Sequence, residues 1–413
     1  MNSGAALAPS LDPTESSVRL LFSCTPAFGH FLPLVPLARA AHRAGHDVAV
    51  MTSAGMASVV AAELPDASFL AAGPMPDVLF TEVARRHPAA DDAGVPGDPA
   101  RVAELFAGVR VDLTMDDAVE AAGAWAPDLV VAEAVDFVGP LVARLLGIPT
   151  AVVAFGPALP EEFTSPMFLV AASRYAARGV APEPPLAVID PTPTLLQDPA
   201  WRPGPALLPL RAEPHRRDGE SAVTGRHSGD GAVPTVLVTL GTVFADDALL
   251  QGIIASIAPG TAEVVATVGV LPDAVLPEDT ATVHYERFRP MAELLEGVDV
   301  VVTAGGAGTV LAALSQGIPL VLIPQGADQP INAGRAAAAG VGLLVDHADA
   351  VGDAVQQVVA DPRFAVAAKA VRDEIEARPS PDDVIAALAH RWSDEPASTR
   401  PTHPIDDQQR STR

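Results

Sequence analysis

Cysteine, lysine and aromatic residues are all scarce in this sequence. Its 413 residues include one cysteine, Cys24, and one lysine, Lys369, and aromatic residues amount to 4%. A single cysteine excludes an internal disulfide bond and a zinc site built from several thiolates. Cys24 lies in a short apolar run, which is typical of a small core residue rather than a nucleophile.

Positive charge is scarce as well. The formal net charge is −25 at pH 7, because 26 Lys and Arg residues face 51 Asp and Glu residues. This balance disfavours nucleic acid and anionic membrane surfaces as partners. An anionic substrate must therefore be held by local geometry, since the overall field repels it.

Long hydrophobic runs are missing. No stretch reaches the ~18 consecutive apolar residues of a transmembrane helix. Residues 1–17 have no basic segment followed by an apolar one, so they do not resemble a signal peptide. We therefore expect a cytoplasmic protein that does not enter a membrane and begins with a short disordered lead.

Strand and helix patterns alternate in both halves of the chain. The length favours two domains, and a hydrophobic content of 49% supports packed cores. Short apolar runs joined by helical patterns predict parallel strands and an α/β fold. The predicted strands cover residues 18–24, 47–51, 128–132, 235–240, 262–268, 298–302 and 320–323. The predicted helices cover residues 32–44, 138–146, 309–316 and 332–339.

A change of composition separates the two halves. The stretch 201–234 is rich in proline, arginine, glycine and acidic residues, which is typical of a linker. The ligand is expected in a cleft between the two units, at the carboxyl ends of the strands. The predicted organisation is a lead at 1–17, an N-terminal α/β domain at 18–205, a linker at 206–233, a C-terminal α/β domain at 234–380, a helix at 381–393 and a disordered tail at 394–413.

The stretch VVTAGGAGT, residues 301–309, is typical of a strand end, a glycine turn and a helix start. Free N–H groups and the helix dipole at such a start bind an anion without a charged side chain. Taken alone the glycine pattern is a weak signal, and a tight turn without a ligand fits it equally well.

A longer signature extends from this turn. Residues 305–342, GGAGTVLAALSQGIPLVLIPQGADQPINAGRAAAAGVG, resemble the donor-binding signature of family 1 glycosyltransferases. TPAFGHFLPLVPLARAAHRAGHDV near the start, WAPDLVVAEAVDFVGPLVARLLGIPT, PTVLVTLGTVF and RFRPMAELL extend the resemblance over most of the chain. It is nearest to the bacterial branch that glycosylates macrolides and other natural products. The resemblance implies a GT-B fold, with two Rossmann-like parallel-sheet domains facing a central cleft.

The resemblance also implies catalytic residues. His30 follows the first strand and matches the general base that deprotonates the acceptor hydroxyl, a task that suits its near-neutral pKa. Glu133 ends a later strand and matches the acid that orients this histidine. Asp136, three residues on, is the second candidate for that acid, although it equally suits a cap of the following helix.

Donor-binding residues are implied in the second half. The glycine turn is expected to contact the diphosphate, Phe288 to lie beside the base, and Asp328 and Gln329 to hold sugar hydroxyls. A carboxylate accepts hydroxyl protons, and an amide both donates and accepts. The predicted donor-binding residues are Thr242, Phe288, Gly306, Ala307, Gly308, Thr309, Asp328 and Gln329.

Two positions depart from the family pattern. Ala304 stands where the family has a histidine that donates to the donor phosphate, and Met291 stands where glutamine is common beside the nucleotide. Arg287 and Arg289 lie close enough in sequence to compensate by reaching phosphate. Three interpretations therefore stay open: an inverting glycosyltransferase, a non-catalytic homologue that assists a partner, and a scaffold whose His30–Glu133 pair performs other acid–base chemistry.

The first interpretation specifies the ligands. It predicts no cofactor and no metal, with a TDP- or UDP-linked sugar as co-substrate and a small hydrophobic natural product as acceptor. The acceptor would lie among first-domain loops at 74–115 and 155–177. The expected assembly is a monomer or homodimer, with an auxiliary protein as a further candidate partner.

Overall fold

The computed structural model describes residues 17–88, 98–217, 233–241, 247–257, 259–268, 276–287 and 289–394. Thr242 and Phe288, both predicted to bind the donor, lie outside these ranges. So do nearly all of the predicted lead, most of the predicted linker and the tail beyond residue 394.

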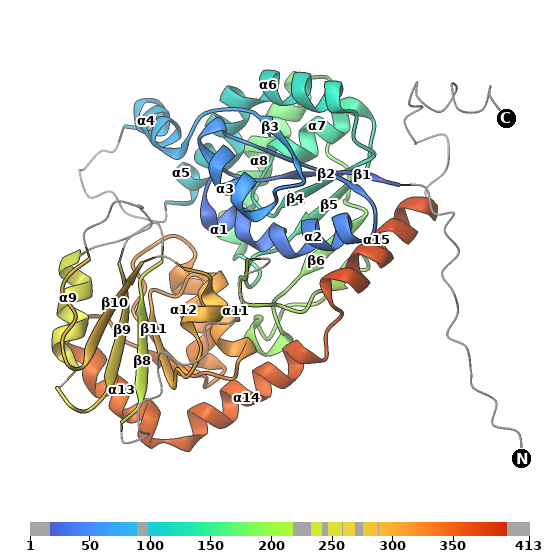
Figure 1. The fold of residues 1–413 in the computed structure, drawn as a ribbon. Coiled ribbons are helices and arrows are strands. Elements are labelled where there is room, and N and C mark those ends of the chain that lie inside the picture. Colours follow the sequence, from blue (N-terminus) through green and yellow to red (C-terminus); the bar gives the residue numbers. More distant parts are fainter. Residues whose placement is uncertain are drawn as a thin grey trace, which may run out of the picture.

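The described residues form two α/β domains, each built around one parallel sheet (Figure 1). The strand order is β3-β2-β1-β4-β5-β6-β7 in the first sheet and β10-β9-β8-β11-β12-β13 in the second. The first sheet contains β1 (Arg19–Ser23), β2 (Asp47–Thr52), β3 (Ser68–Ala71), β4 (Leu129–Glu133), β5 (Thr150–Val153), β6 (Ala187–Asp190) and β7 (Leu207–Pro209). The second contains β8 (Thr235–Thr239), β9 (Glu263–Val268), β10 (Val283–Arg287), β11 (Val300–Thr303), β12 (Leu320–Leu322) and β13 (Gly342–Leu344). The predicted fold class is confirmed.

Helices cover both faces of each sheet. The helices of the first domain are α1 (Phe28–Phe31), η1 (Leu32–Leu34), α2 (Val35–Arg43), η2 (Ala54–Met56), α3 (Ala57–Glu63), α4 (Pro76–Arg86), α5 (Pro99–Ala103), η3 (Glu104–Val109), α6 (Arg110–Trp125), α7 (Val138–Leu146), α8 (Glu161–Ala177) and η4 (Thr194–Leu196). Those that follow are α9 (Asp247–Ser256), α10 (Met291–Leu294), α11 (Ala307–Ser315), α12 (Gln329–Ala338), η5 (Ala348–Ala350), α13 (Val351–Ala360), α14 (Pro362–Glu376) and α15 (Pro381–Asp394).

The central strands are apolar on both sides because helices bury both faces of each sheet. β4 and β8 are buried at every residue. Alternate residues of a strand enter opposite cores: Leu20 and Phe22 pack with α2, whereas Leu21 packs on the other face with α6 and α7. This double burial explains why short apolar runs identified the strands.

The last helix returns to the first domain. Figure 1 shows α14 running along the second domain and α15 continuing from it to lie beside α2. Val384, Ile385 and Leu388 of α15 are buried in the core that β1 and α2 share. Arg43 of α2 also pairs with Asp382 at the start of α15, with Nη2 2.8 Å from Oδ1. The predicted helix at 381–393 is confirmed to within one residue.

The described part of the chain between the domains, up to residue 217, contacts both domains. β7 extends the first sheet to Pro209, beyond the expected domain boundary at 205. His215 and Arg217 then reach the buried carboxylate of Glu63 in α3, at 2.7 and 2.9 Å. The His215 carbonyl accepts a hydrogen bond of 3.1 Å from the Ala292 N–H in α10 of the second domain.

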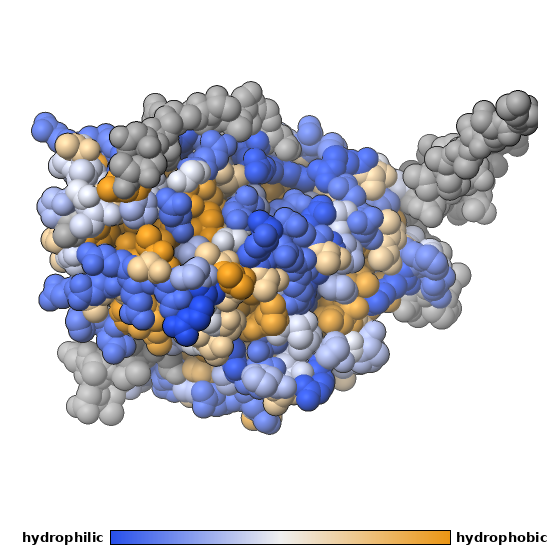
Figure 2. All heavy atoms as spheres, turned by 90° about the horizontal axis from the view of Figure 1, so that it is seen from below, coloured by the Kyte–Doolittle hydropathy of each residue, from blue (hydrophilic) through white to orange (hydrophobic). Residues whose placement is uncertain are grey.

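The surface mixes polar and apolar residues. Figure 2 shows hydrophobic residues gathered on the left of the face seen from below, over the half of the molecule that carries the second sheet. Among the described residues, no helix has both the length and the apolar character needed to cross a membrane.

Candidate active site

The predicted catalytic and phosphate-binding segments lie at corresponding places in the two sheets. β1 lies between β2 and β4, and β8 lies between β9 and β11, so the strand order reverses at these strands. His30 follows β1, Glu133 ends β4, and the glycine turn follows β11. The carboxyl ends of strands at such a switch point are where doubly wound sheets bind ligands.

His30 and Glu133 form a direct pair. The Nδ1 atom of His30 lies 3.0 Å from Oε1 of Glu133, whose side chain is 1% exposed, while the His30 side chain is 20% exposed. Glu133 also accepts hydrogen bonds from the Val135 N–H (2.7 Å) and the Thr25 N–H (3.3 Å). These contacts fix the carboxylate. Since Nδ1 of His30 faces Glu133, Nε2 is the ring nitrogen that points away from this carboxylate.

The pKa values of the pair move in opposite directions. Burial alone would lower the pKa of His30, but the charge and hydrogen bond of Glu133, helped by the charge of Asp328, raise it above its ordinary value. Burial would raise the pKa of Glu133, but the charge and hydrogen bond of His30, together with hydrogen bonds from Val135 and Thr25, lower it. Asp328 belongs to the second domain, so its charge acts on His30 across the domain boundary.

Asp136 has a different set of partners. Its Oδ1 lies 2.8 Å from Nη2 of Arg110, and its Oδ2 accepts a hydrogen bond from the Ser23 hydroxyl. The N–H groups of Val138 and Gly139, in the first turn of α7, also donate to it at 3.2 and 3.3 Å. Asp136 therefore caps α7 and neutralises a buried arginine, and Glu133 is the acid that contacts His30.

Two aromatic rings border His30. The ring of Phe155, in the loop after β5, lies 5.3 Å from the imidazole, and the ring of Phe106 lies 5.7 Å from it. Phe106 belongs to η3, a π-helical turn between α5 and α6, a feature often found at functional sites. Both residues lie in the predicted acceptor segments, so two apolar rings from those segments neighbour the imidazole.

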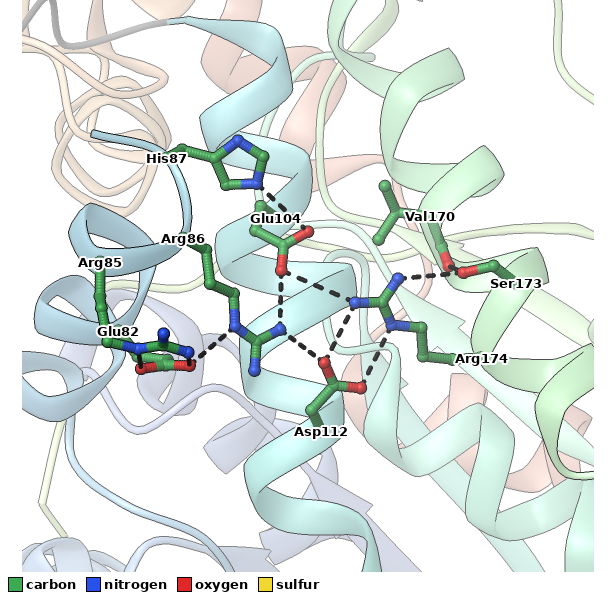
Figure 3. Close-up of polar contacts among 9 residues, drawn as sticks. All are labelled: Glu82, Arg85, Arg86, His87, Glu104, Asp112, Val170, Ser173 and Arg174. Atoms are coloured by element: carbon green, nitrogen blue, oxygen red, sulfur yellow. Dashed lines mark hydrogen bonds and ion pairs between the residues drawn. The ribbon is translucent and has the colours of Figure 1, made fainter. Parts of the chain in front are cut away.

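An ion-pair network connects η3, which carries Phe106, to the neighbouring helices (Figure 3). Arg86 of α4 lies 2.9 Å from Glu104 of η3 and 2.6 Å from Asp112 of α6. Arg174 of α8 reaches the same two carboxylates, at 3.6 and 3.0 Å. The network therefore joins α4, η3, α6 and α8, the helices that carry the predicted acceptor segments.

The glycine turn has the form of an anion site. Gly305 has φ +89°, and Gly306 is the N-cap of α11, which begins at Ala307 rather than at the predicted Thr309. The N–H groups of Ala307, Gly308 and Thr309 thus occupy the first three helical positions, whose N–H groups have no partner within the helix. A Cβ added at Gly306 or Gly308 would meet no atom within 4 Å, so the helix start borders open space.

Asp328 and Gln329 lie at the start of α12. Gln329 is 7% exposed, and its Oε1 accepts hydrogen bonds from the N–H groups of Gln325 (2.8 Å) and Gly326 (3.2 Å). That oxygen therefore braces the loop before α12, and the amide nitrogen is the part of Gln329 left to donate. Asp328 Oδ2 accepts a hydrogen bond of 2.7 Å from Asn332, a residue that sequence analysis did not select.

Ala304 and Met291, the two departures from the family pattern, both pack in apolar surroundings. Ala304 is 1% exposed and packs with the core of the second sheet, and Met291 begins α10 and packs against the opposite core. The guanidinium of Arg289 is held by Glu293 (3.1 Å) and Glu286 (3.3 Å). Compensation by Arg287 or Arg289 stays a prediction.

Two family models match the chain. One, the C-terminal domain of the erythromycin biosynthesis protein CIII-like family, matches residues 251–390, and the corresponding N-terminal domain matches residues 39–208. The elloramycin glycosyltransferase ElmGT of Streptomyces olivaceus is 30% identical over 90% of this chain and 97% of its own. The L-demethylnoviosyl transferase of Streptomyces niveus is 30% identical over 90% of this chain and 98% of its own.

Solved structures agree with these matches. The Streptomyces sp. SF2575 glycosyltransferase SsfS6 has a TM-score of 0.74 at 27% identity and covers 90% of this chain and 99% of its own. SnogD from Streptomyces nogalater has a TM-score of 0.73 at 28% identity and covers 91% and 99%. Two facing Rossmann-like domains with a site between them are the GT-B architecture. The chain belongs to the family 1 glycosyltransferases of GT-B fold, and these matches do not favour the non-catalytic interpretation.

Proposed function

We propose that this glycosyltransferase moves a sugar from a nucleoside diphosphate to a hydroxyl of a hydrophobic natural product, with inversion at the anomeric carbon. The observation that carries the proposal is the buried His30–Glu133 pair at the switch point of the first sheet. The charge of Asp328 reaches that pair from the phosphate-binding domain.

The chemistry is a single displacement. Nε2 of His30 removes the proton from the acceptor hydroxyl as that oxygen attacks the anomeric carbon. The bond between the anomeric carbon and the phosphate oxygen breaks, and the nucleoside diphosphate leaves with the electron pair. Because Nδ1 faces Glu133 at 3.0 Å, the carboxylate stabilises the imidazolium that forms. One displacement from the opposite face inverts the anomeric configuration.

The leaving diphosphate is stabilised by backbone groups. Its negative charge develops in front of the first N–H groups of α11, where the helix dipole favours an anion. Asp328 accepts hydrogen bonds from sugar hydroxyls, and the amide nitrogen of Gln329 donates one. No cofactor takes part in this mechanism.

Relatives support the ligand classes. A structure of SsfS6, at 27% identity, is complexed with thymidine diphosphate. Other relatives are named as transferring desosamine to 10-deoxymethynolide or as acting on elloramycin. We accordingly propose a TDP-linked sugar as donor, with UDP as the alternative, and an aglycone that fits between Phe106 and Phe155.

The test combines binding with turnover. Calorimetry should give micromolar binding of TDP or UDP, and TDP release from a TDP-sugar should depend on an added hydroxylated aglycone. His30→Ala should keep nucleotide binding and lower turnover about 10²–10⁴-fold. A native protein that binds neither nucleotide would refute the proposal, and so would full turnover by His30→Ala.

A further inference from the structure

Asn332 connects the two parts of the proposed donor site. It lies on α12 one turn after Asp328 and is 3% exposed. Its Nδ2 donates to the Gly305 carbonyl at 2.9 Å and to Asp328 Oδ2 at 2.7 Å. Both hydrogens of this amide are therefore used, one on the phosphate side of the site and one on the sugar side.

The orientation of the Asn332 amide is fixed by chemistry. Both of its partners are acceptors, so the nitrogen must face them and the oxygen must face away. The oxygen faces the first domain, where a Cβ added at Gly156 would lie 3.2 Å from Oδ1 and 3.1 Å from the Cβ of Ala307. The glycine at 156 thus lets the loop after β5 approach both Asn332 and the start of α11.

The contact with Gly305 determines where a backbone donor points. The peptide between Gly305 and Gly306 is planar and trans, so its C=O and N–H point in opposite directions. Because Asn332 holds the Gly305 carbonyl, the Gly306 N–H is directed away from Asn332. That N–H directly precedes those of Ala307 and Gly308, the first N–H groups of α11, and a Cβ added at Gly306 or Gly308 would border open space.

The contact between Asn332 and Asp328 involves only one of the two carboxylate oxygens. Asn332 occupies Oδ2, which fixes the plane of the group and leaves Oδ1 to accept from a sugar hydroxyl. We propose that Asn332 is a positioning residue that holds the phosphate-binding turn and the sugar-binding carboxylate in one register. This inference rests on the proposed function, because the diphosphate and the sugar are the groups that the register serves.

The test separates the phosphate contact from the sugar contact. The variants are Asn332→Ala and the isosteric Asn332→Asp, with Gly334→Ala on the same helix as the matched control, since a Cβ there meets nothing within 4 Å. Calorimetry measures TDP and TDP-glucose binding, and turnover is measured at donor saturation. Asn332→Ala should bind TDP about 2- to 10-fold more weakly, the effect of one misplaced neutral hydrogen bond. Asn332→Asp should bind TDP at least as weakly, because it also places a second carboxylate beside Asp328 and the diphosphate.

The sugar contribution should respond separately. In the native protein, TDP-glucose should bind more tightly than TDP. This gain in affinity should be smaller in Asp328→Ala and also smaller in Asn332→Ala. The double variant should lose no more of this gain than Asp328→Ala alone, because the two residues act as one unit. The turnover at saturation should fall in both Asn332 variants and stay within twofold of native in Gly334→Ala.

A donor-independent measurement keeps the inference falsifiable. Amide hydrogen exchange in residues 303–309 should accelerate in both Asn332 variants, because the Gly305 carbonyl loses its partner. Folded variants with native exchange, native affinities and native turnover would overturn the inference and leave the proposed function intact. A native protein that binds none of TDP, UDP and TDP-glucose would overturn the proposed function and this inference with it.

Discussion

At the scale of single residues, the site depends on how Glu133 changes the chemistry of His30. An isolated buried imidazole resists protonation, because burial lowers its pKa. Glu133 reverses that tendency at a distance of 3.0 Å, and Asp328 adds to the effect from the second domain. A base with a raised pKa holds the transferred proton more strongly, but it is inactive over a wider acidic range.

The pH profile of Glu133→Gln tests this balance. The base works only when neutral, so the acidic limb of kcat/KM in the native enzyme should lie above the ordinary pKa of histidine. Without the carboxylate, burial dominates, and the limb should move to lower pH while the plateau falls about 10²–10⁴-fold. Glu82→Gln, an acid on α4, serves as the control. A limb that stays in place in Glu133→Gln would contradict this account.

Ala304 stands where the resemblance to the family implies a histidine that donates to the donor phosphate. The backbone N–H groups of α11 are left to hold the diphosphate, and a methyl group adds no hydrogen bond. Ala304→His restores a side chain that can donate a hydrogen bond to the phosphate. It should strengthen TDP binding about tenfold or more, since a hydrogen bond to a charged group contributes about 1.5–3 kcal/mol.

The control for this variant separates size from hydrogen bonding. Ala304 is 1% exposed, so any larger side chain must displace its neighbours. Ala304→Phe adds a ring without a donor and should not strengthen binding. Calorimetric affinities for TDP that are equal in Ala304→His and the native protein would show that position 304 does not reach the phosphate.

Residue roles were predictable from sequence only where a motif specified them. His30 and Glu133 were identified together by resemblance, and their contact agrees with that pairing. From sequence Asp136 is the second candidate after Glu133, because the feature that separates their roles is the partner Arg110, 26 positions from Asp136. Asn332 lies inside the donor-binding signature at 305–342. Its two partners, Gly305 and Asp328, become neighbours of each other only when the turn after β11 packs against α12.

At the scale of elements, the π-helical turn η3 links the base to its surroundings. It places Phe106 against His30 and is followed directly by Arg110, which is 2% exposed and bonds to the Cys24 carbonyl and Asp136, both at 2.8 Å. Arg110 thereby ties α6 to the end of β1 and to the start of α7. This buried ion pair holds α6 in addition to the network that Asp112 joins.

Breaking that pair should be costly for stability. Arg110→Met leaves Asp136 buried without its counter-ion, and such a change typically removes about 3–5 kcal/mol from the free energy of unfolding. Urea unfolding followed by circular dichroism measures the loss, and Arg110→Met combined with Asp136→Asn should recover part of it. Arg85→Met, which removes an exposed pair with Glu82, is the control and should change stability little. Equal effects of the two arginine substitutions would refute this role.

The predicted strands match β1, β2, β4, β8, β9, β11 and β12, which all lie inside the sheets, whereas none of the edge strands β3, β7, β10 and β13 was predicted. The predicted strand at 235–240 matches β8, whose residues are all buried, because double burial leaves a continuous apolar run. β7 and β13 have only three residues each and lie at sheet edges, so their sequences carry little pattern. The expected domain boundary fell before β7 for the same reason.

At the scale of the whole molecule, chain order and domain membership differ. α15 follows the second domain in sequence but completes the core of the first, where Leu388 is 1% exposed beside residues of α2. The described residues also link the domains near the site, since Arg335 of α12 pairs with Asp198 and Glu374 accepts from the Thr194 N–H at 2.5 Å. The relative position of His30 and the glycine turn therefore depends on contacts spread over the full length of the chain.

Leu388→Ala tests whether α15 belongs energetically to the first domain. Truncating a buried leucine leaves a cavity and should lower the stability of that domain by about 2–5 kcal/mol. Val366→Ala on α14 removes a side chain that is 68% exposed and should change little. Hydrogen exchange resolved by peptide should show faster opening of β1 and α2 in Leu388→Ala, with β8 and β11 protected as in the native protein. Acceleration confined to the second sheet would assign α15 to the domain that precedes it in sequence. Acceleration in the first sheet would mean that the segment after the donor-binding domain stabilises the catalytic base.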